Sequence, residues 1–209
     1  VTNSVIAGTC SSADSTGCEV RILDISNISS PTFVGGIDLA IGSNRVYVVG
    51  KYLYVVNGAV AGTGCSITDA SGCEFRIYDI SNPASPVFVN GLDRAIETES
   101  VYIFGKYAYI GNSTVAGTCT GTTVTGCEFS IYDISNPVSL SAQNGIDTAD
   151  GVRDIYVTGK YAYIGIDENP GTCSGATLTG CEVQIYDIST PTAITAVSGI
   201  DRAIATRGT

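Results

Sequence analysis

Hydrophobic and polar residues alternate with a period of two along most of this chain, which is the pattern of half-buried β-strands. Within residues 98–151 the pattern predicts strands over 100–105, 107–111 and 127–134 and a weaker fourth strand over 140–146. Gly105 and Lys106 supply the tight turn between the first two strands, and Pro137 ends the ladder after the third. No stretch of ten or more residues has helical periodicity, so the pattern predicts an all-β, four-stranded antiparallel meander.

The same unit occurs four times along the chain. The Asp of a D-I-S tripeptide and the Asp of a G-[IL]-D tripeptide both recur at steps of 55, 54 and 54 residues. These markers are Asp24, Asp79, Asp133 and Asp187 for D-I-S, and Asp38, Asp93, Asp147 and Asp201 for G-[IL]-D. We therefore predict a single repeat domain, 1–209, with repeats 1 to 4 at approximately 1–42, 43–97, 98–151 and 152–209.

Four-stranded repeats of about 54 residues suit the blades of a β-propeller, while the coils of the competing β-solenoid are usually much shorter. The elements V-x-G-x-Y-[AL]-Y-[VI] and [FV]-x-I-Y-D-I-S-[NT]-P, followed by a short strand ending in Gly, resemble the LVIVD-type repeat of secreted bacterial and archaeal proteins. This resemblance covers all four repeats and implies a propeller-like fold, but its motif carries no catalytic residue. The chain departs from the motif through an added Cys-flanked hairpin in every repeat and through its small number of copies.

The two ends of the chain predict an incomplete first repeat. Val1–Cys10 aligns with a second strand, so repeat 1 lacks its inner strand, and residues 201–209 stop where a further inner strand should begin. Three explanations stay open: a four-bladed ring with one incomplete blade, a fragment of a longer repeat protein, or a subunit completed by its neighbour. Unpaired blade edges invite strand addition and head-to-tail assembly in the third case. Because the chain starts at Val1, we also expect it to be a processed mature chain or a fragment.

Each repeat contains one pair of cysteines at C-x₇-C spacing. The pairs are Cys10 with Cys18, Cys65 with Cys73, Cys119 with Cys127, and Cys173 with Cys181. The repetition favours a disulfide within every repeat over free or differently paired thiols, and a metal site is disfavoured by the long spacing and the absence of His. Regular disulfides predict an oxidising compartment, and hence an extracellular or cell-surface location.

Composition excludes several classes of function. The 209 residues include no His, which removes the imidazole base and the imidazole metal ligand. The formal net charge of −10 argues against nucleic acid as a partner, and no apolar run reaches the roughly 20 residues that span a membrane. We therefore expect neither an enzyme nor a membrane-spanning protein.

The recurring aspartates are the candidates for a binding site. We expect the D-I-S aspartates to fix the turn after the third strand through bonds from backbone N–H groups. The G-[IL]-D aspartates, Asp38, Asp93, Asp147 and Asp201, fall near the channel mouth of a propeller and are a candidate calcium ring. No cofactor other than calcium is expected, and Arg94 and Arg202 point to ion pairs or turn caps as the competing role for these carboxylates.

Other polar and aromatic residues suggest surface roles. Asn27 and Asn112 lie in N-x-[ST] sequons and are candidate glycosylation sites. Glu19 with Arg21 and Glu74 with Arg76 are interpreted as surface ion pairs, because the Arg becomes Ser130 and Gln184 in repeats 3 and 4. The 12 tyrosines are interpreted as packing residues between blades, with a sugar-stacking platform as the alternative. The irregular segment 167–170 is a candidate for a contact or a cation site of repeat 4 alone.

Together these observations predict an extracellular structural or interaction protein. We expect disulfide-bonded propeller blades that self-assemble into a surface layer or filament through unpaired blade edges. The alternative is a secreted propeller that binds Ca²⁺ or a glycan at its channel mouth. The expected partners are therefore copies of the same chain, with glycans as second candidates.

Overall fold

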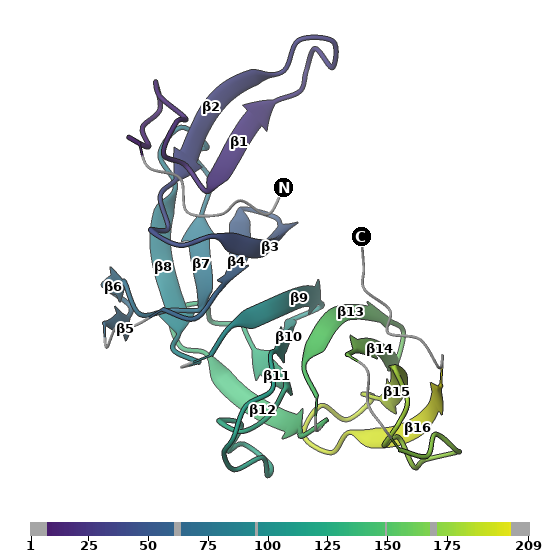
Figure 1. Ribbon diagram of the computed structural model, residues 1–209. Helices are drawn as coiled ribbons and strands as arrows, with labels where there is room; N and C mark the ends of the chain where they lie inside the picture. The colour runs from purple at the N-terminus through teal and green to yellow at the C-terminus, as the bar shows by residue number, and fades with distance from the viewer. Residues whose placement is uncertain (1–7, 61–63, 95, 149, 168–170, 202–209) are drawn as a thin grey trace. The chain divides into compact units, whose positions relative to one another are not determined.

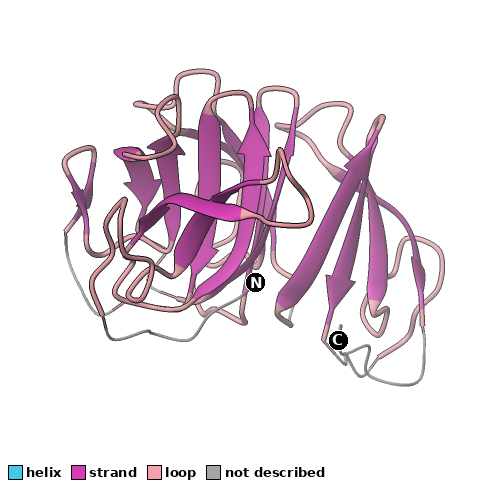
Figure 2. Ribbon diagram, turned by 90° about the horizontal axis from the view of Figure 1, so that it is seen from above, coloured by secondary structure: helices cyan, strands magenta, loops and turns pink. Residues whose placement is uncertain are grey.

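The computed structural model describes residues 8–60, 64–94, 96–148, 150–167 and 171–201. Every regular element in these ranges is a β-strand (Figure 2), as the period-two pattern predicts. The same ranges contain no helix long and apolar enough to cross a membrane. The chain divides into two compact parts, Val1–Glu97 with repeats 1 and 2 and Thr98–Thr209 with repeats 3 and 4.

The N-terminal part holds a two-stranded sheet from repeat 1 and a four-stranded antiparallel sheet from repeat 2 (Figure 1). Its strands are β1 (Val20–Asp24), β2 (Thr32–Ile37), β3 (Ser43–Val49), β4 (Tyr52–Asn57), β7 (Phe75–Asp79) and β8 (Val87–Leu92). A small hairpin, β5 (Cys65–Ser66) with β6 (Asp69–Ala70), lies in the loop between β4 and β7. The second strand expected for repeat 1 falls largely on residues 1–7, outside the described residues.

The C-terminal part consists of two four-stranded antiparallel meanders, as predicted. Their strands are β9 (Thr98–Phe104), β10 (Tyr107–Asn112), β11 (Phe129–Asp133) and β12 (Ser141–Ile146), then β13 (Val152–Thr158), β14 (Tyr161–Ile166), β15 (Val183–Asp187) and β16 (Thr195–Ile200). The first strands of the two sheets, β9 and β13, lie next to each other. Sheets that neighbour each other through their first strands are the arrangement of propeller blades, so the fold is propeller-like.

The turn between the first two strands of a repeat depends on a glycine. Gly50, Gly105 and Gly159 have φ of 58°, 61° and 57°, and each is followed by a lysine that completes a two-residue turn. A positive φ at the first turn position, which glycine adopts without steric cost, is typical of the type II′ turn that matches the twist of antiparallel strands.

Each repeat is closed by its own disulfide. The structure bonds Cys10 to Cys18, Cys65 to Cys73, Cys119 to Cys127, and Cys173 to Cys181, with Cα–Cα distances of 4.8 to 5.0 Å. This is the pairing expected from the repeat. The bonds bridge the polar loop that precedes the third strand of each sheet.

A glycine of the fourth strand makes room for each disulfide. A Cβ on Gly36 or Gly91 would lie 2.5 Å from the Sγ of Cys18 or Cys73, and Gly145 and Gly199 face Cys127 and Cys181 in the same way. The glycine of the G-[IL]-D tripeptide therefore recurs because the sulfur atoms occupy the space above it.

The sheets pack face to face through apolar side chains, many of them aromatic. In the C-terminal part Phe129 of β11 stacks on Tyr186 of β15, with ring centroids 6.4 Å apart. In the N-terminal part Val20 and Ile37 of repeat 1 pack with Leu53, Val55 and Tyr78 of repeat 2. Tyr54, Tyr78, Tyr109, Tyr132 and Tyr186 are all buried, which agrees with the packing role expected for strand tyrosines.

Replacing Gly145 with Ala should destabilise the protein by about 1–3 kcal/mol, because overpacking a filled space forces neighbouring atoms to move. The new Cβ would lie 2.8 Å from the Cβ of Cys127 and 2.9 Å from the carbonyl oxygen of Phe129. Gly165→Ala is the matched control, since its Cβ would meet nothing closer than 3.8 Å. Urea unfolding of the oxidised proteins measures both effects, and equal stabilities of the two variants would contradict this account.

Candidate functional site

Three acidic positions recur in every repeat and form the candidate site. They are the D-I-S aspartates (Asp24, Asp79, Asp133, Asp187), the G-[IL]-D aspartates (Asp38, Asp93, Asp147, Asp201) and a glutamate after the second cysteine (Glu19, Glu74, Glu128, Glu182). The first set ends the third strand of each sheet, and the glutamates precede that strand. The G-[IL]-D aspartates follow the fourth strand. The three sets of carboxylates therefore lie at different places in each repeat and contact different neighbours.

The D-I-S aspartates cap the turn that follows their strand. The Oδ1 atoms of Asp24 and Asp79 each accept a hydrogen bond from a backbone N–H two residues later at 2.8 Å, and those of Asp133 and Asp187 do so at 2.9 Å. This is the Asx-turn predicted from the sequence. Asp79 also accepts a bond of 2.6 Å from the hydroxyl of Ser81.

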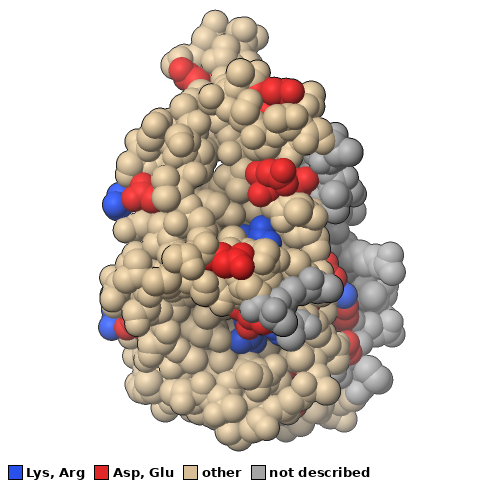
Figure 3. All heavy atoms as spheres, turned by 90° about the vertical axis from the view of Figure 1, so that its left-hand side faces the viewer, with Lys and Arg blue, Asp and Glu red and all other residues tan. Residues whose placement is uncertain are grey.

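The second oxygen of three of these aspartates, Asp79, Asp133 and Asp187, binds a lysine, a contact that was not predicted from the sequence. The Oδ2 atoms of Asp79 and Asp133 lie 2.7 Å from the Nζ atoms of Lys51 and Lys106, and Asp187 lies 3.1 Å from Lys160. Each lysine comes from the glycine-lysine turn, and its ammonium group also lies about 5 Å from the ring centroid of the next tyrosine. On the face drawn in Figure 3, several basic side chains lie directly beside acidic ones.

These contacts lower the pKa of the aspartates. Hydrogen bonds from lysine and serine bring the pKa of Asp79 and Asp133 to about 2. Bonds from Ser189 and then Lys160 do the same for Asp187. The pKa of Asp24 is also lowered, by its bonds from Ser26. The pKa values of Lys51, Lys106 and Lys160 are raised by their aspartate partners. Both members of each pair are therefore charged over a wide range of pH.

The glutamate after the second cysteine is a buried clamp on the backbone. Glu74 is fully buried, and its Oε1 and Oε2 accept bonds from the N–H groups of Val60 at 2.9 Å and Arg94 at 2.7 Å. Glu128 is 1% exposed and accepts bonds from Val115 and Thr148, both at 3.0 Å. The carboxylate thus ties the loop after the second strand to the segment after the fourth.

Repeat 1 shows the bond to the segment after the fourth strand, and repeat 4 has a glutamate that is buried in the same way. Glu19 is 2% exposed and accepts a bond of 2.8 Å from the N–H of Leu39. Glu182 is 4% exposed. A buried carboxylate needs several donors to replace the water that it loses, and backbone N–H groups supply them in this chain.

The interpretation of Glu19 with Arg21 and Glu74 with Arg76 as surface ion pairs was wrong for the glutamates and for Arg76. Arg76 is 2% exposed, and it donates to the carbonyl oxygens of Cys73 at 3.0 Å and Leu39 at 3.2 Å. In repeat 4 the amide of Gln184 donates to the equivalent carbonyl of Cys181 at 3.4 Å. Arg76 and Gln184 thus donate to equivalent backbone carbonyls in repeats 2 and 4, whereas the smaller Ser130 of repeat 3 is buried without such a bond.

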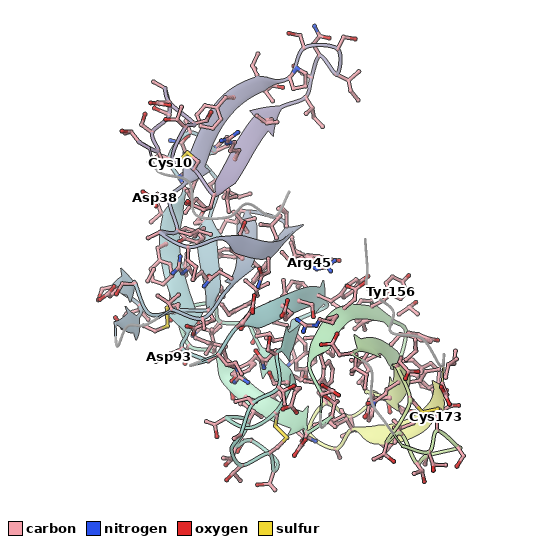
Figure 4. All side chains as sticks on the ribbon, viewed as in Figure 1. Cys10, Asp38, Arg45, Asp93, Tyr156 and Cys173 are labelled. Carbon is pink, nitrogen blue, oxygen red and sulfur yellow. A yellow bond between two sulfur atoms is a disulfide. The ribbon has the colours of Figure 1, made fainter. Side chains whose placement is uncertain are left out.

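The G-[IL]-D aspartates lie at the exposed ends of the fourth strands. Asp38 caps its own turn, because its Oδ1 accepts a bond of 2.9 Å from the N–H of Ala40. Figure 4 labels Asp38 and Asp93 in the N-terminal part, and Asp147 and Asp201 belong to the C-terminal part. Within the described residues, no group of three or more acidic or cysteine side chains is placed to hold a metal ion. A calcium ring made by all four stays a prediction, since it requires both parts of the chain.

The two sequons have different surroundings. Asn112 is fully buried at the end of β10, its Nδ2 donates to the carbonyl of Cys127 at 3.0 Å, and its Oδ1 accepts a bond from Thr98 at 3.1 Å. The side chain of Asn112 is therefore already occupied by hydrogen bonds inside the folded chain, and its glycosylation stays a prediction. Asn27 lies in an exposed turn, and its glycosylation stays a prediction.

Asp167, at the start of the irregular segment, binds a cation of the protein itself. Its Oδ2 accepts bonds from the Nε and Nη2 of Arg153 at 2.8 and 2.6 Å, and Nη1 of Arg153 contacts Glu99. These two carboxylates raise the pKa of the guanidinium. The contact between Arg153 and Glu99 links repeats 4 and 3. Residues 168–170 of the irregular segment lie outside the described residues.

A shallow groove lies between the turns of repeats 3 and 4. Phe104, Lys106, Tyr107, Lys160 and Pro191 line it. It combines aromatic surface with two ammonium groups, although both lysines already bind aspartates. This groove lies at the glycine-lysine turns and not at the G-[IL]-D aspartates, where the sequence placed a binding site.

Comparison with known families agrees with the resemblance seen in the sequence. A family model described as the LVIVD repeat matches the chain over residues 16–38, 70–93, 97–114 and 151–170. The first two matches cover the third and fourth strands of repeats 1 and 2, and the others cover the first two strands of repeats 3 and 4. A search of curated proteins finds no match.

Replacing Glu128 with Gln should lower the free energy of unfolding by about 1–3 kcal/mol, because a buried N–H would then face the NH₂ group of the amide. The matched control is Asp154→Asn, which removes the same charge from an exposed side chain whose Oδ1 can still accept the bond from Ile155. Denaturant unfolding at neutral pH measures the difference. A cost no larger than that of the control would show that the clamp does not need the carboxylate.

The aspartate–lysine pairs predict an acid-dependent loss of stability. The folded-state pKa of Asp79, Asp133 and Asp187 is about 2, below the ordinary 3.8, so their contribution is present above about pH 4 and lost as pH falls toward 2. Thermal unfolding between pH 5 and 2 should show a smaller decrease in Tm for the triple Asp→Asn variant than for the wild type. Parallel curves for the two proteins would contradict the role of the pairs.

Proposed function

Since the LVIVD repeat model matches this chain at four places and every repeat contains a disulfide, we propose that the chain is an extracellular structural protein that assembles from copies of itself. In this proposal the disulfide-bonded blades are rigid building blocks of a surface layer or filament. The repeated disulfides are consistent with the location, because such bonds persist in oxidising compartments.

One observation carries the proposal: apolar side chains that are buried between neighbouring repeats are exposed at the first repeat. Leu23 and Ile25 are 49% and 64% exposed, whereas Tyr186 and Ile188 at the equivalent positions of repeat 4 are 5% and 4% exposed. Exposed apolar surface of this kind is typical of an interaction site.

The recurring acidic residues support a structural role over a catalytic one. Both oxygens of Asp79, Asp133, Glu74 and Glu128 bind backbone N–H groups or lysine. Carboxylates held in this way stabilise turns and loops in every repeat alike. We therefore propose that the chain is not an enzyme.

The second candidate function is ligand binding, with a glycan or Ca²⁺ as the ligand. The groove at Phe104 and Tyr107 favours the glycan, because aromatic surface beside polar groups suits a sugar ring. For Ca²⁺ the candidates remain the G-[IL]-D aspartates. This function requires no self-assembly, which separates it from the first proposal.

Native mass measurement and electron microscopy over a range of protein concentrations test the proposal. We expect the oxidised protein to form species larger than the 21.5 kDa chain, with a fraction that rises with concentration. A 21.5 kDa monomer at every concentration would contradict self-assembly. If such a monomer bound sugars on a glycan array or Ca²⁺ in calorimetry, ligand binding would replace it as the function.

A further inference from the structure

The sheets of repeats 3 and 4 show how two repeats join. Side chains of a strand alternate between the face turned to the following repeat, here called the forward face, and the face turned to the preceding repeat, the rear face. The forward face of repeat 3 presents Tyr109, Phe129 and Ile131, and the rear face of repeat 4 presents Tyr186 and Ile188. These five residues belong to one buried cluster, with Phe129 stacked on Tyr186.

The N-terminal part repeats this contact with different side chains. Val20 occupies in repeat 1 the position of Phe129, and Tyr78 occupies in repeat 2 the position of Tyr186. Val20 and Tyr78 are 7% and 6% exposed and lie in one apolar cluster. The contact is therefore a property of the repeat, and its forward position accepts valine as well as phenylalanine.

Within the described residues, this cover is missing on the rear face of repeat 1 and on the forward face of repeat 4. On the rear face of repeat 1, Leu23 and Ile25 are largely exposed, as described above. On the forward face of repeat 4, Tyr163, Val183 and Ile185 are half-buried, and Tyr156 is 56% exposed. Their counterparts in repeat 3, Tyr109, Phe129 and Ile131, are 2%, 0% and 0% exposed. The first and last repeats thus present the two halves of the contact that joins inner repeats.

We infer that copies of the chain join head to tail, with the forward face of repeat 4 stacked on the rear face of repeat 1 of the next copy. By equivalence with Phe129 and Tyr186, Val183 of one copy then contacts Leu23 of the next. The inference rests on the proposed self-assembly and specifies its surfaces: sheet faces, in place of the strand edges expected from the sequence. Because the two faces differ, the contact is heterologous and generates a ring or an open filament.

The apolar chemistry of both faces suits a second copy as the occupant. Leu23, Ile25, Val183 and Ile185 are aliphatic, and the same arrangement of Val20 against Leu53, Val55 and Tyr78 is already buried inside the chain. Burying such side chains stabilises an interface by about 25 cal/mol per Å² of apolar surface. A charge placed at either position has no partner in that interface, so it should separate the copies.

Single charge substitutions on each face test the inference. Leu23→Lys and Val183→Glu should each weaken assembly of the oxidised protein about tenfold or more, measured as the concentration of half-assembly. Mixing the two variants should restore assembly, because the lysine introduced into one variant then meets the glutamate introduced into the other, while the remaining faces are unchanged. Val87→Lys and Val138→Glu are the matched controls, since these valines are 60% and 54% exposed and lie outside both faces. Circular dichroism of every variant verifies that it folds.

The outcomes separate the inference from the proposed function. Suppose that the wild type assembles but that neither face substitution weakens assembly, or that mixing the two variants does not restore assembly. The contact inferred here is then wrong, while self-assembly stands. Strand addition at blade edges would give that result. If the wild type is a monomer at every concentration, the proposed function fails, and the two faces are covered in another way, such as by closure of a ring within one chain.

Discussion

A buried glutamate that accepts hydrogen bonds from two distant backbone N–H groups is the interaction on which repeats 2 and 3 depend. Glu128 sits beside the second cysteine of its disulfide and reaches the loop after β10 through Val115 and the segment after β12 through Thr148. Two segments that lack regular structure are thereby bonded to one carboxylate inside the protein. The second of these segments leads into the next repeat.

The two ends of each sheet are held by different chemistry. At the glycine-lysine end, an exposed aspartate binds a serine N–H with one oxygen and a lysine with the other, as in Asp133 with Lys106. At the cysteine end, a buried glutamate binds backbone groups alone. Exposed ion pairs are screened by salt and sensitive to acid, whereas buried bonds to N–H groups are protected from both. The apolar faces between these ends are left free to contact neighbouring repeats.

The strands and the disulfides could be predicted because their signals are local. The predicted strands of repeat 3 differ from β9 to β12 by two residues or fewer, and the cysteine pairs are 8 residues apart. The lysine contacts and the glutamate clamp were missed because they join residues 13 to 28 positions apart, where spacing alone does not show contact. Their signal was present in Lys51, Lys106 and Lys160 and in the invariant glutamate after each second cysteine. The burial of Asn112 was not predicted, because a sequon does not reveal burial.

The disulfides have a mechanical consequence, because each one closes a loop inside a single repeat and none joins two repeats. When the oxidised chain is pulled, a repeat that unfolds can lengthen only by the residues outside its loop. The 8 residue steps between bonded cysteines carry no force, which withholds about 22 Å of extension per repeat, at roughly 3.4 Å per residue less the 4.9 Å between the bonded Cα atoms. Reduction would release that length, so the redox state of the surroundings sets how far the chain can stretch.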